Sequence, residues 1–308
     1  MASFISYLSQ NFYLLIIILA TVLVYLGWQK KWHLTMFSAS STPVLDMYSK
    51  DLTQMAREGK LDAVVGRKEE LKRVIRILSR RTKDNVILIG KPGVGKTAIA
   101  EALAQAIIQK SVPPILHSKR VLALDLNGLV SGTKYRGEFE ERLSRINNEL
   151  VAAQRKIILF IDEIHALAQV GEASGALNAG DILKPALARG DLQVIGATTP
   201  LEYEKYIKQD ITLERRLQPI LVSEPSPEET LEILKGIRPQ YEKFHQVKIL
   251  DEALEAAIKF SANYLPGRCY PDKAIDVMDE AASKIKLENL GNGKMPQVTA
   301  KDVETITI

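Results

Sequence analysis

Five short runs of apolar residues alternate with stretches of helix-forming residues between residues 69 and 222. The runs are Val86–Ile89, Val121–Leu124, Ile157–Ile161, Val194–Ala197 and Ile220–Val222. Continuous apolar runs of this length are typical of strands that are buried on both faces of a parallel sheet. Helices are predicted over Glu69–Leu78, Lys96–Ile108 and Phe139–Ala153. The alternation predicts an α/β fold in which helices flank a parallel sheet.

Helical patterns replace strand patterns after Val222. Ser226 and Glu229 form a capping-box pattern with Pro227 at the first helical position, which marks the start of a helix. Helices are predicted over Pro227–Gly236, Glu252–Tyr264 and Asp272–Lys286, with one more helix start at Thr299. We therefore expect a sheet domain that ends near Ser223, followed by a small helical domain.

The composition is that of an ordinary globular protein with room for roughly two domains and an appendage. Of the 308 residues, 25% are charged and 46% are hydrophobic. The net charge of +4 is too weak to indicate nucleic-acid binding by itself. Cys269 is the only cysteine, so an internal disulfide is excluded, and the four histidines lack the spacing of metal ligands.

The most informative motif of the chain lies between a predicted strand and a predicted helix. Its residues are Gly90-Lys91-Pro92-Gly93-Val94-Gly95-Lys96-Thr97, which fit G-x-x-x-x-G-K-[ST] in the context that a phosphate loop requires. The N–H groups of the loop and of the helix N-terminus, which includes Ala98, favour the binding of phosphate. Lys96 can reach the β- and γ-phosphates, and the Thr97 hydroxyl can ligate Mg²⁺. The motif predicts a site for ATP and Mg²⁺.

Asp162 and Glu163 directly follow the apolar run Ile157–Ile161. Ligands of α/β sheets bind beyond the carboxyl ends of the strands, where this pair is expected to lie. One carboxylate can hold Mg²⁺ through water, and the next can polarise the water that attacks the γ-phosphate. An acidic pair after a strand is often structural, but its position downstream of a phosphate loop favours the catalytic interpretation.

Two further groups complete the candidate chemistry. The run Val194–Thr199 ends in hydroxyls that can hydrogen-bond a γ-phosphate or the attacking water, although an ordinary turn would explain such an end in isolation. Arg215 and Arg216 are adjacent guanidiniums, a pair that is more often solvated on a surface. Supplied across a subunit boundary, they would stabilise the charge that develops in the transition state.

The N-terminal region differs from the rest of the chain. No charged side chain precedes Lys30, and Phe12–Trp28 is predominantly apolar. The pattern predicts a transmembrane helix over about residues 8–28, within an anchor at 1–33, and a polar linker over 34–47. Lys30 and Lys31 place the N-terminus outside and the remainder on the cytoplasmic side. Two alternatives are less favoured. A cleaved signal peptide would need a basic n-region, which is absent, and would export the ATP-using domain. A buried core helix would need a polar face to offset its apolar surface.

From about Tyr48 to Leu287 the chain resembles the first ATPase module of the Clp family of AAA+ protein unfoldases. The matching segments include DLTQMAREGKLDAVVGR, GKPGVGKTAIAEALA, SGTKYRGEFEERL, FIDEIHAL, IGATTPLEYEKYI, LERR and PDKAIDVMDEAA. The motifs are many, ordered and specific. The resemblance implies an AAA+ P-loop NTPase fold, with a large α/β nucleotide-binding domain over 48–223 and a small helical lid domain over 224–308.

The resemblance also implies roles for individual residues. Lys96 would be the phosphate lysine, Thr97 and Asp162 would hold Mg²⁺, and Glu163 would activate water. Thr199 matches the sensor-1 position. The segment that lies near the adenine is matched by Val65, Gly66 and Arg67. Arg215 and Arg216 match the trans-acting arginine fingers of the family. Fingers of this kind imply a homo-oligomeric ring, typically a hexamer. Pro271–Lys273 lies in the sensor-2 region without a clean sensor-2 arginine, so it receives no role.

Lys134, Tyr135, Arg136 and Gly137 match the first pore loop of the family. An aromatic side chain between cations can grip an extended polypeptide without reading its sequence, so the resemblance implies polypeptide clients. Without the resemblance, a surface tyrosine in a flexible loop would be the better interpretation. Gly171–Gly180 matches the second pore loop.

The sequence departs from the family pattern in three regions. An N-terminal substrate-receiving domain, a coiled-coil middle insertion and a second ATPase module are missing from it. These departures make partnership with the Clp peptidase or with an Hsp70-type chaperone doubtful. No protease motif such as H-E-x-x-H occurs.

The favoured hypothesis is a membrane-tethered, ring-forming ATPase that unfolds, threads or remodels proteins at the cytoplasmic face of a membrane. The alternative is an ATP-switched membrane scaffold or regulatory assembly protein that does not thread a substrate. A nucleic-acid motor has little support, because the sequence has no basic stripe and its pore loop is Clp-like.

Overall fold

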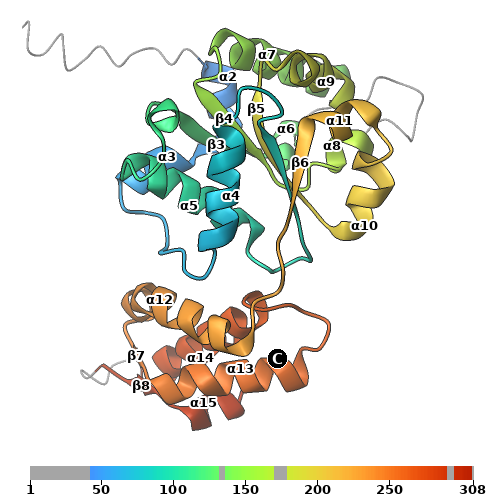
Figure 1. Ribbon diagram of the computed structural model, residues 1–308. Coiled ribbons are helices and arrows are strands. Elements are labelled where there is room, and N and C mark those ends of the chain that lie inside the picture. Colours follow the sequence, from blue (N-terminus) through green and yellow to red (C-terminus); the bar gives the residue numbers. More distant parts are fainter. Residues whose placement is uncertain (1–41, 132–135, 170–178, 290–294, 307–308) are drawn as a thin grey trace, which may run out of the picture. The chain divides into compact units, whose positions relative to one another are not determined.

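Figure 1 shows the computed structural model, which describes residues 42–131, 136–169, 179–289 and 295–306. Apart from Pro43, the first residue of α2, the elements below belong to the unit that begins at Val44. The Glu149 carboxylate accepts hydrogen bonds from the N–H groups of Val44 and Leu45, at 3.0 and 2.8 Å, in α2 (Pro43–Met47). Negative charge stabilises a helix N-terminus, so Glu149 fixes the start of this unit.

A mixed sheet forms the centre of the described structure. Its strands are β1 (Ser49–Asp51), β2 (Asn85–Ile89), β3 (Arg120–Leu124), β4 (Ile157–Ile161), β5 (Gln193–Thr198) and β6 (Leu217–Leu221). The spatial order is β1-β3-β4-β5-β2-β6. Every pair is parallel except β1 with β3, which is antiparallel. The prediction of an all-parallel sheet is corrected at this edge, because Ser49–Asp51 is too short and too polar to show a strand pattern.

Helices cover both faces of the sheet (Figure 1). On one face lie α3 (Leu52–Arg57), α4 (Lys68–Leu78) and α5 (Lys96–Ile108), and on the other lie α7 (Arg136–Ala152), α9 (Ala179–Arg189) and α11 (Ile211–Arg216). Val86 and Leu88 of β2 pack into the hydrophobic core under α3, α4 and α5, whereas Ile87 packs into the core under α7, α9 and α11. Burial on both faces explains why the parallel strands are continuously apolar, and it confirms the predicted α/β architecture.

Short elements join these layers. They are a 3₁₀ helix (Pro114–Leu116), α6 (Leu126–Val130), α8 (Ala166–Gln169), α10 (Pro200–Glu202) and a π-helical turn (Tyr203–Ile207). Most of them connect the carboxyl ends of strands to the next layer. They therefore surround the edge of the sheet where the predicted chemistry lies.

A helical subdomain follows β6. It contains α12 (Pro227–His245), α13 (Asp251–Tyr264), α14 (Asp272–Glu288) and α15 (Ala300–Glu304), with a small parallel pair formed by β7 (Lys248–Ile249) and β8 (Gln297–Val298). The predicted capping box is confirmed, since Ser226 and Glu229 exchange hydrogen bonds at the start of α12. α12 continues past the predicted end at Gly236 and through Pro239. The domain bounds at 48–223 and 224–308 stay a prediction.

The predicted single-pass membrane location is wrong, and it is corrected here. Among the described residues, no helix combines the length and the apolar character that a membrane span requires. α12 is long enough at 19 residues but carries a charged face. The segment at residues 8–28 on which the prediction rested lies outside the described residues, as do residues 34–41 of the predicted linker, whereas its last residues form α2.

Candidate functional site

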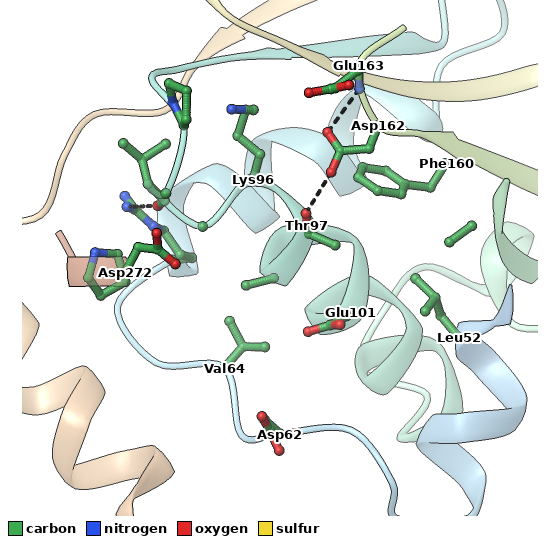
Figure 2. Close-up of a pocket in the computed structure, with 18 of the residues that line it drawn as sticks. Leu52, Asp62, Val64, Lys96, Thr97, Glu101, Phe160, Asp162, Glu163 and Asp272 are labelled. Carbon is green, nitrogen blue, oxygen red and sulfur yellow. Dashed lines mark hydrogen bonds between the residues drawn. The ribbon is translucent and has the colours of Figure 1, made fainter. Parts of the chain in front are cut away.

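The predicted site residues gather at the carboxyl edge of three neighbouring strands. The phosphate loop follows β2, Asp162 and Glu163 follow β4, and Thr198 ends β5, which lies between these two strands. A cleft of about 990 Å³ opens at this edge (Figure 2). We call the part formed by Lys96, Thr97, Asp162, Glu163 and Thr199 the strand end of the cleft. The lid end is formed by Asp62, Val64, Glu101, Ile233, Ile237, Tyr241 and Ile275.

The backbone of the phosphate loop depends on glycine. Gly93 and Gly95 have φ of +79° and +90°, in the left-handed region that favours glycine. Gly95 occupies the N-cap of α5, so the first N–H groups of this helix face the cleft without a side-chain cap. Gly90 runs so close to the segment directly after β6 that a Cβ there would lie 2.6 Å from the Val222 carbonyl oxygen. The loop is therefore an open cradle of N–H groups, which suits an anion.

Lys96 supplies the positive charge of the cradle. Its Nζ donates to the carbonyl oxygens of Gly90 and Lys91, at 2.9 and 3.1 Å. Burial lowers the pKa of Lys96, and the carboxylates of Asp162, Glu202 and Glu163 oppose this shift. The ammonium is thus held by exchangeable backbone acceptors at the mouth of the loop, where phosphate oxygens can replace them.

Thr97 and Asp162 meet across the strand end. Thr97 Oγ1 donates to Asp162 Oδ2 at 3.1 Å, and the Glu163 N–H donates to Asp162 Oδ1 at 3.0 Å (Figure 2). Glu163 has a φ of +49°, a conformation that costs energy in a non-glycine residue and that is concentrated at functional sites. Its backbone turns the side chain away from the strand and into the cleft.

The donor set of the strand end fits Mg²⁺. A threonine hydroxyl and a carboxylate are hard oxygen ligands, and protein sites for Mg²⁺ commonly use one or two such groups and leave the remaining positions to water and substrate phosphates. Within the described ranges, no cluster of three or more His, Cys, Asp or Glu side chains could hold a metal ion. A metal here would depend on phosphate oxygens as further ligands, so the metal and the nucleotide would bind together.

A network of side chains beside Thr199 was not predicted from the sequence. His165 is 6% exposed, and its Nε2 lies 3.0 Å from Glu202 Oε1. Thr199 Oγ1 donates to Glu202 Oε2 at 2.7 Å, so Glu202 joins the segment after β4 to the end of β5. The only sequence signal was the capping-box spacing of Thr199 and Glu202.

The lid end is lined mainly by apolar side chains. Ile233, Ile237 and Ile275 come from α12 and α14, and Val64 comes from the segment before α4. Glu101 also lines this end, and burial, assisted by the charge of Asp62, raises the pKa of its carboxyl group. Burial raises the pKa of the Tyr241 hydroxyl as well. An apolar slot with few polar groups suits a flat heterocycle better than a phosphate.

Arg67 lines the cleft and also contacts protein backbone. Its guanidinium donates to the carbonyl oxygens of Val94 and Ser223, at 2.6 and 3.0 Å, and pairs with Glu70 at 3.0 Å. It is 8% exposed. Arg67 therefore ties the phosphate loop to the segment that leads from β6 into α12.

The other predicted nucleotide contacts divide into two groups. Residues Val65, Pro92, Gly93, Val94, Gly95, Lys96, Thr97 and Ala98 line the cleft. Gly66, Gly90 and Lys91 are outside the lining, and the roles of Gly66 and Gly90 are steric: Gly66 has a φ of +79° beside Ile233, and Gly90 packs against Val222. Direct contact with a nucleotide stays a prediction for all of these residues.

The predicted arginine fingers do not line the cleft of their own chain. Arg215 and Arg216 end α11, and neither guanidinium has a hydrogen bond or ion pair with the part of the chain that the structure describes. Arg215 is exposed and Arg216 is half-buried.

The sensor-2 region supplies no free cation to the cleft. Lys273 is 7% exposed, with its Nζ 4.1 Å from the centroid of the Tyr270 ring and 4.0 Å from Glu224. Asp272 lines the cleft instead, beside Gly93, and burial raises the pKa of its carboxyl group. The sequence analysis assigned no role to this region, and none is assigned to it from the structure.

Half of the predicted pore loop lies outside the described residues. Lys134 and Tyr135 fall in a gap of the description, and Arg136 and Gly137 begin α7. The second candidate pore loop, Gly171–Gly180, is also almost entirely outside it.

A phosphate loop after β2, an acidic pair after β4 and a helical lid beside the same cleft define an ATPase of the AAA class. The family model "ATPase family associated with various cellular activities (AAA)" matches residues 86–221, and the model "AAA lid domain" matches residues 226–307. The chain belongs to the Clp family of AAA ATPases, of which it carries the first ATPase module and its lid.

Curated relatives support this assignment. The chain is 58% identical over 251 residues to the ATP-binding subunit ClpC of the ATP-dependent Clp protease of Staphylococcus epidermidis, covering 82% of this chain and 31% of the relative. It is 58% identical over 252 residues to the chaperone protein ClpB of Oceanobacillus iheyensis, with the same coverage. The chain thus spans about a third of the length of the curated relatives that it matches.

Solved structures give the same result. A closed-state reconstruction of Hsp104 with ATPγS and FITC-casein is similar to this chain with a TM-score of 0.76 and 45% identity, over 84% of this chain and 44% of that chain. The Saccharomyces cerevisiae Hsp104–ADP complex is similar with a TM-score of 0.76 and 46% identity. The predicted class of enzyme, an ATP hydrolase, is confirmed.

Proposed function

We propose that this module hydrolyses ATP in a ring of identical subunits, typically six, and uses the energy to unfold or remodel proteins. The contact that carries the proposal is the Thr97–Asp162 hydrogen bond of 3.1 Å, with Glu163 directly beside it. A hydroxyl and a carboxylate in contact at the open N-terminus of α5, with Glu163 next to them, support the proposal that Mg²⁺ and the γ-phosphate bind there.

The residues divide the chemistry among themselves. The phosphate loop and Lys96 would hold and orient the triphosphate, and Thr97 with Asp162 would hold Mg²⁺, which supplies charge neutralisation when bound. Glu163 would take a proton from the attacking water. Thr199 would orient the same water or the γ-phosphate. The apolar lid end would hold the adenine, with Val65 and the side chains of α12 against it.

Arg215 and Arg216 support the ring. Because they are unpartnered among the described residues and lie away from their own cleft, we propose that they complete the cleft of a neighbouring subunit. Charge of this kind stabilises the transition state of phosphoryl transfer. It also makes hydrolysis depend on assembly.

The relatives suggest the substrate class. One similar structure is of Hsp104 with casein, and one relative is a subunit of an ATP-dependent protease. We therefore propose polypeptide clients for this chain, gripped by Tyr135 between Lys134 and Arg136. No nucleic-acid partner is proposed.

The first test is Glu163→Gln, which keeps the shape of the side chain and removes the base. ATP hydrolysis is expected to fall about a hundredfold or more while ATP still binds. Glu255→Gln, an exposed change on α13, is the matched control. Full hydrolysis by Glu163→Gln would exclude Glu163 as the base.

The same variant separates remodelling from a switch. Bound to ATP, Glu163→Gln is expected to retain unfolded proteins such as casein, and Tyr135→Ala is expected to hydrolyse ATP without unfolding a tagged client. Recovery of a single folded partner in fixed stoichiometry would favour an ATP-switched assembly protein instead.

The ring itself is tested by mixing two inactive variants. Glu163→Gln keeps its fingers, whereas the double variant Arg215→Ala and Arg216→Ala keeps its base. If fingers act between subunits, mixed rings recover hydrolysis that neither variant shows alone. Mixtures that stay inactive, although they assemble, would assign the arginines to another task.

A further inference from the structure

Glu202 is the centre of a hydrogen-bond network that lies between the ends of β4 and β5. Its Oε2 accepts from Thr199 Oγ1 at 2.7 Å, and its Oε1 accepts from His165 Nε2 at 3.0 Å. On the other side of the imidazole, Nδ1 lies 3.1 Å from the hydroxyl of Thr198, which is 1% exposed. The network therefore connects the segment after the acidic pair to both hydroxyls at the end of β5.

The chemistry of these groups fixes where the protons lie. A carboxylate only accepts hydrogen bonds, so His165 Nε2 and the Thr199 hydroxyl must both donate to Glu202. Both oxygens of Glu202 are then engaged, which leaves this carboxylate poorly placed to act as a base or a metal ligand, although it lines the cleft. The single proton of the Thr199 hydroxyl is directed at Glu202, and one lone pair of this oxygen accepts the Glu202 N–H at 3.4 Å, so it has one lone pair left to offer toward the cleft.

We propose that Glu202 is a positioning residue for ATP hydrolysis: it fixes the Thr199 hydroxyl as a hydrogen-bond acceptor for the attacking water, and His165 holds Glu202 in that orientation. The proposal rests on the proposed function of the cleft. A hydroxyl that donates to a carboxylate becomes a stronger acceptor, because hydrogen bonds in a chain polarise one another. Water that donates to both Thr199 and Glu163 would have its lone pair directed at the phosphorus.

A helix cap alone explains only half of this arrangement. Thr199 and Glu202 form a capping box, but that box needs no histidine, and α10 is only three residues long. Directly after Glu202 the chain enters the π-helical turn, which places Tyr206 parallel to the His165 ring with centroids 6.3 Å apart. π-Helical turns are frequent at functional sites. The turn and the buried imidazole hold Glu202 from the side opposite Thr199.

The direct test is Glu202→Ala, measured as kcat, KM and the affinity for ADP. We expect kcat to fall about tenfold to a hundredfold, because a small displacement of a reacting group is costly, while ADP affinity changes less than about threefold. Glu204→Ala is the matched control, since Glu204 lies two residues further on, is exposed and pairs with Lys208. An unchanged kcat in Glu202→Ala would overturn the proposal.

Two variants of His165 test how Glu202 is held. Both replace the imidazole with an amide side chain, so they differ only in how far the amide nitrogen reaches. The amide nitrogen of His165→Gln can reach the position of Nε2 and donate to Glu202, whereas that of His165→Asn reaches only the position of Nδ1. We expect His165→Gln to keep most of the activity and His165→Asn to lose about as much as Glu202→Ala. Equal losses in two variants that melt at the same temperature would contradict the proposed role of His165.

A double variant shows whether Glu202 acts through Thr199. Thr199→Val removes the hydroxyl and keeps the shape of the side chain. If Glu202 and Thr199 act on the same water, adding Glu202→Ala to Thr199→Val should lower kcat little further, because the effects of coupled residues are not additive. Fully multiplied losses would overturn the proposal. If Glu163→Gln abolishes hydrolysis while the Glu202 and His165 variants do not, the proposed function stands and this inference alone fails.

Discussion

The strand end and the lid end of the cleft are built from different kinds of residue. At the strand end, polar side chains follow β2, β4 and β5, three neighbours in one sheet, and each is fixed by backbone geometry or a hydrogen bond. At the lid end, apolar side chains extend from α12, α14 and the segment before α4, and hydrophobic packing holds them in position. Groups at the strand end can distinguish a transition state from a bound nucleotide, whereas the lid end binds both alike.

The largest effect should come from breaking the strand end at Lys96. In Lys96→Met the cation that faces the phosphates is lost and most of the side-chain volume is kept. We expect kcat/KM for ATP to fall about a hundredfold or more, the range seen when one charge-stabilising donor is removed. Lys68→Met, an exposed lysine at the start of α4, should stay within about twofold. A loss confined to KM would show that Lys96 contributes to binding only.

The strand end could be predicted from the sequence because its information is local. The phosphate loop is eight consecutive residues with required flanks, and Asp162 and Glu163 directly follow a buried strand, so the motif and the topology place them together. The left-handed φ of Glu163 could not be predicted, because the segment after β4 makes long-range contacts, such as the hydrogen bond from the Ile164 N–H to the Ala197 carbonyl oxygen, that no local pattern shows. His165 was missed for a related reason: a lone histidine next to an acidic pair carries no pattern of its own.

The lid end could not be predicted in the same way. Val64, Ile233 and Ile275 are far apart in sequence, and their patterns show only that each helix buries a face. Arg67 shows the limit clearly. Arg67 lines the cleft, and its predicted place near the adenine stays a prediction, but the hydrogen bonds from its guanidinium to two backbone carbonyl oxygens could not be predicted from the sequence. The edge strand β1 was missed because a strand of three polar residues has no hydrophobic period.

Arg67 joins the two ends, and its removal should be the next largest effect. Arg67→Ala leaves the carbonyl oxygens of Val94 and Ser223 without their donor, in a place that is nearly closed to water. A loss of about 2 to 4 kcal/mol in the free energy of unfolding is expected. Arg73→Ala is the matched control on α4, since Arg73 makes one exposed contact with Pro219, and it should change stability by about 0.5 kcal/mol or less.

The result for Arg67→Ala is interpreted from two measurements, the stability of the variant and the change in its stability when ADP binds. Denaturation should be followed with and without ADP, because a ligand that ties the phosphate loop to the lid can replace part of the lost connection. ADP is then expected to raise the melting temperature of Arg67→Ala more than that of Arg73→Ala. Equal stability of the two variants would show that the buried guanidinium is not what connects the loop to α12.

A smaller effect is expected at the lid end from Val64→Ala. Val64 is half-buried and lines the cleft, so the change removes apolar contact without removing a charge. About 1 kcal/mol of contact corresponds to a roughly fivefold loss of affinity, equal for ATP and ADP, with kcat at saturation unchanged. Binding of both nucleotides and steady-state kinetics check this. A fall in kcat would mean that the lid end also contributes to the transition state.

The smallest and most specific effect concerns Glu101, the ionisable group of the lid end on α5. Burial raises its pKa in the folded chain above the ordinary value of 4.5, so the folded state binds the proton more tightly than the unfolded state. Stability linked to Glu101 is therefore greatest below pH 4.5 and declines as the pH rises through the raised value. Glu101→Gln removes that decline. Its melting temperature should exceed that of the parent at pH 7.5, by under about 2 °C, and by less at pH 5.

Glu69→Gln on α4 gives a control of opposite sign. Glu69 is exposed, and the hydrogen bond from Lys72 lowers its pKa, so its contribution is present above pH 4.5 and is lost as the pH falls. Removing this charge should slightly lower the melting temperature at pH 7.5, where Glu101→Gln raises it. If Glu101→Gln instead lowers the melting temperature at pH 7.5, its carboxylate has a stabilising partner in the folded chain. The lid end would then hold charge in the way that the strand end does.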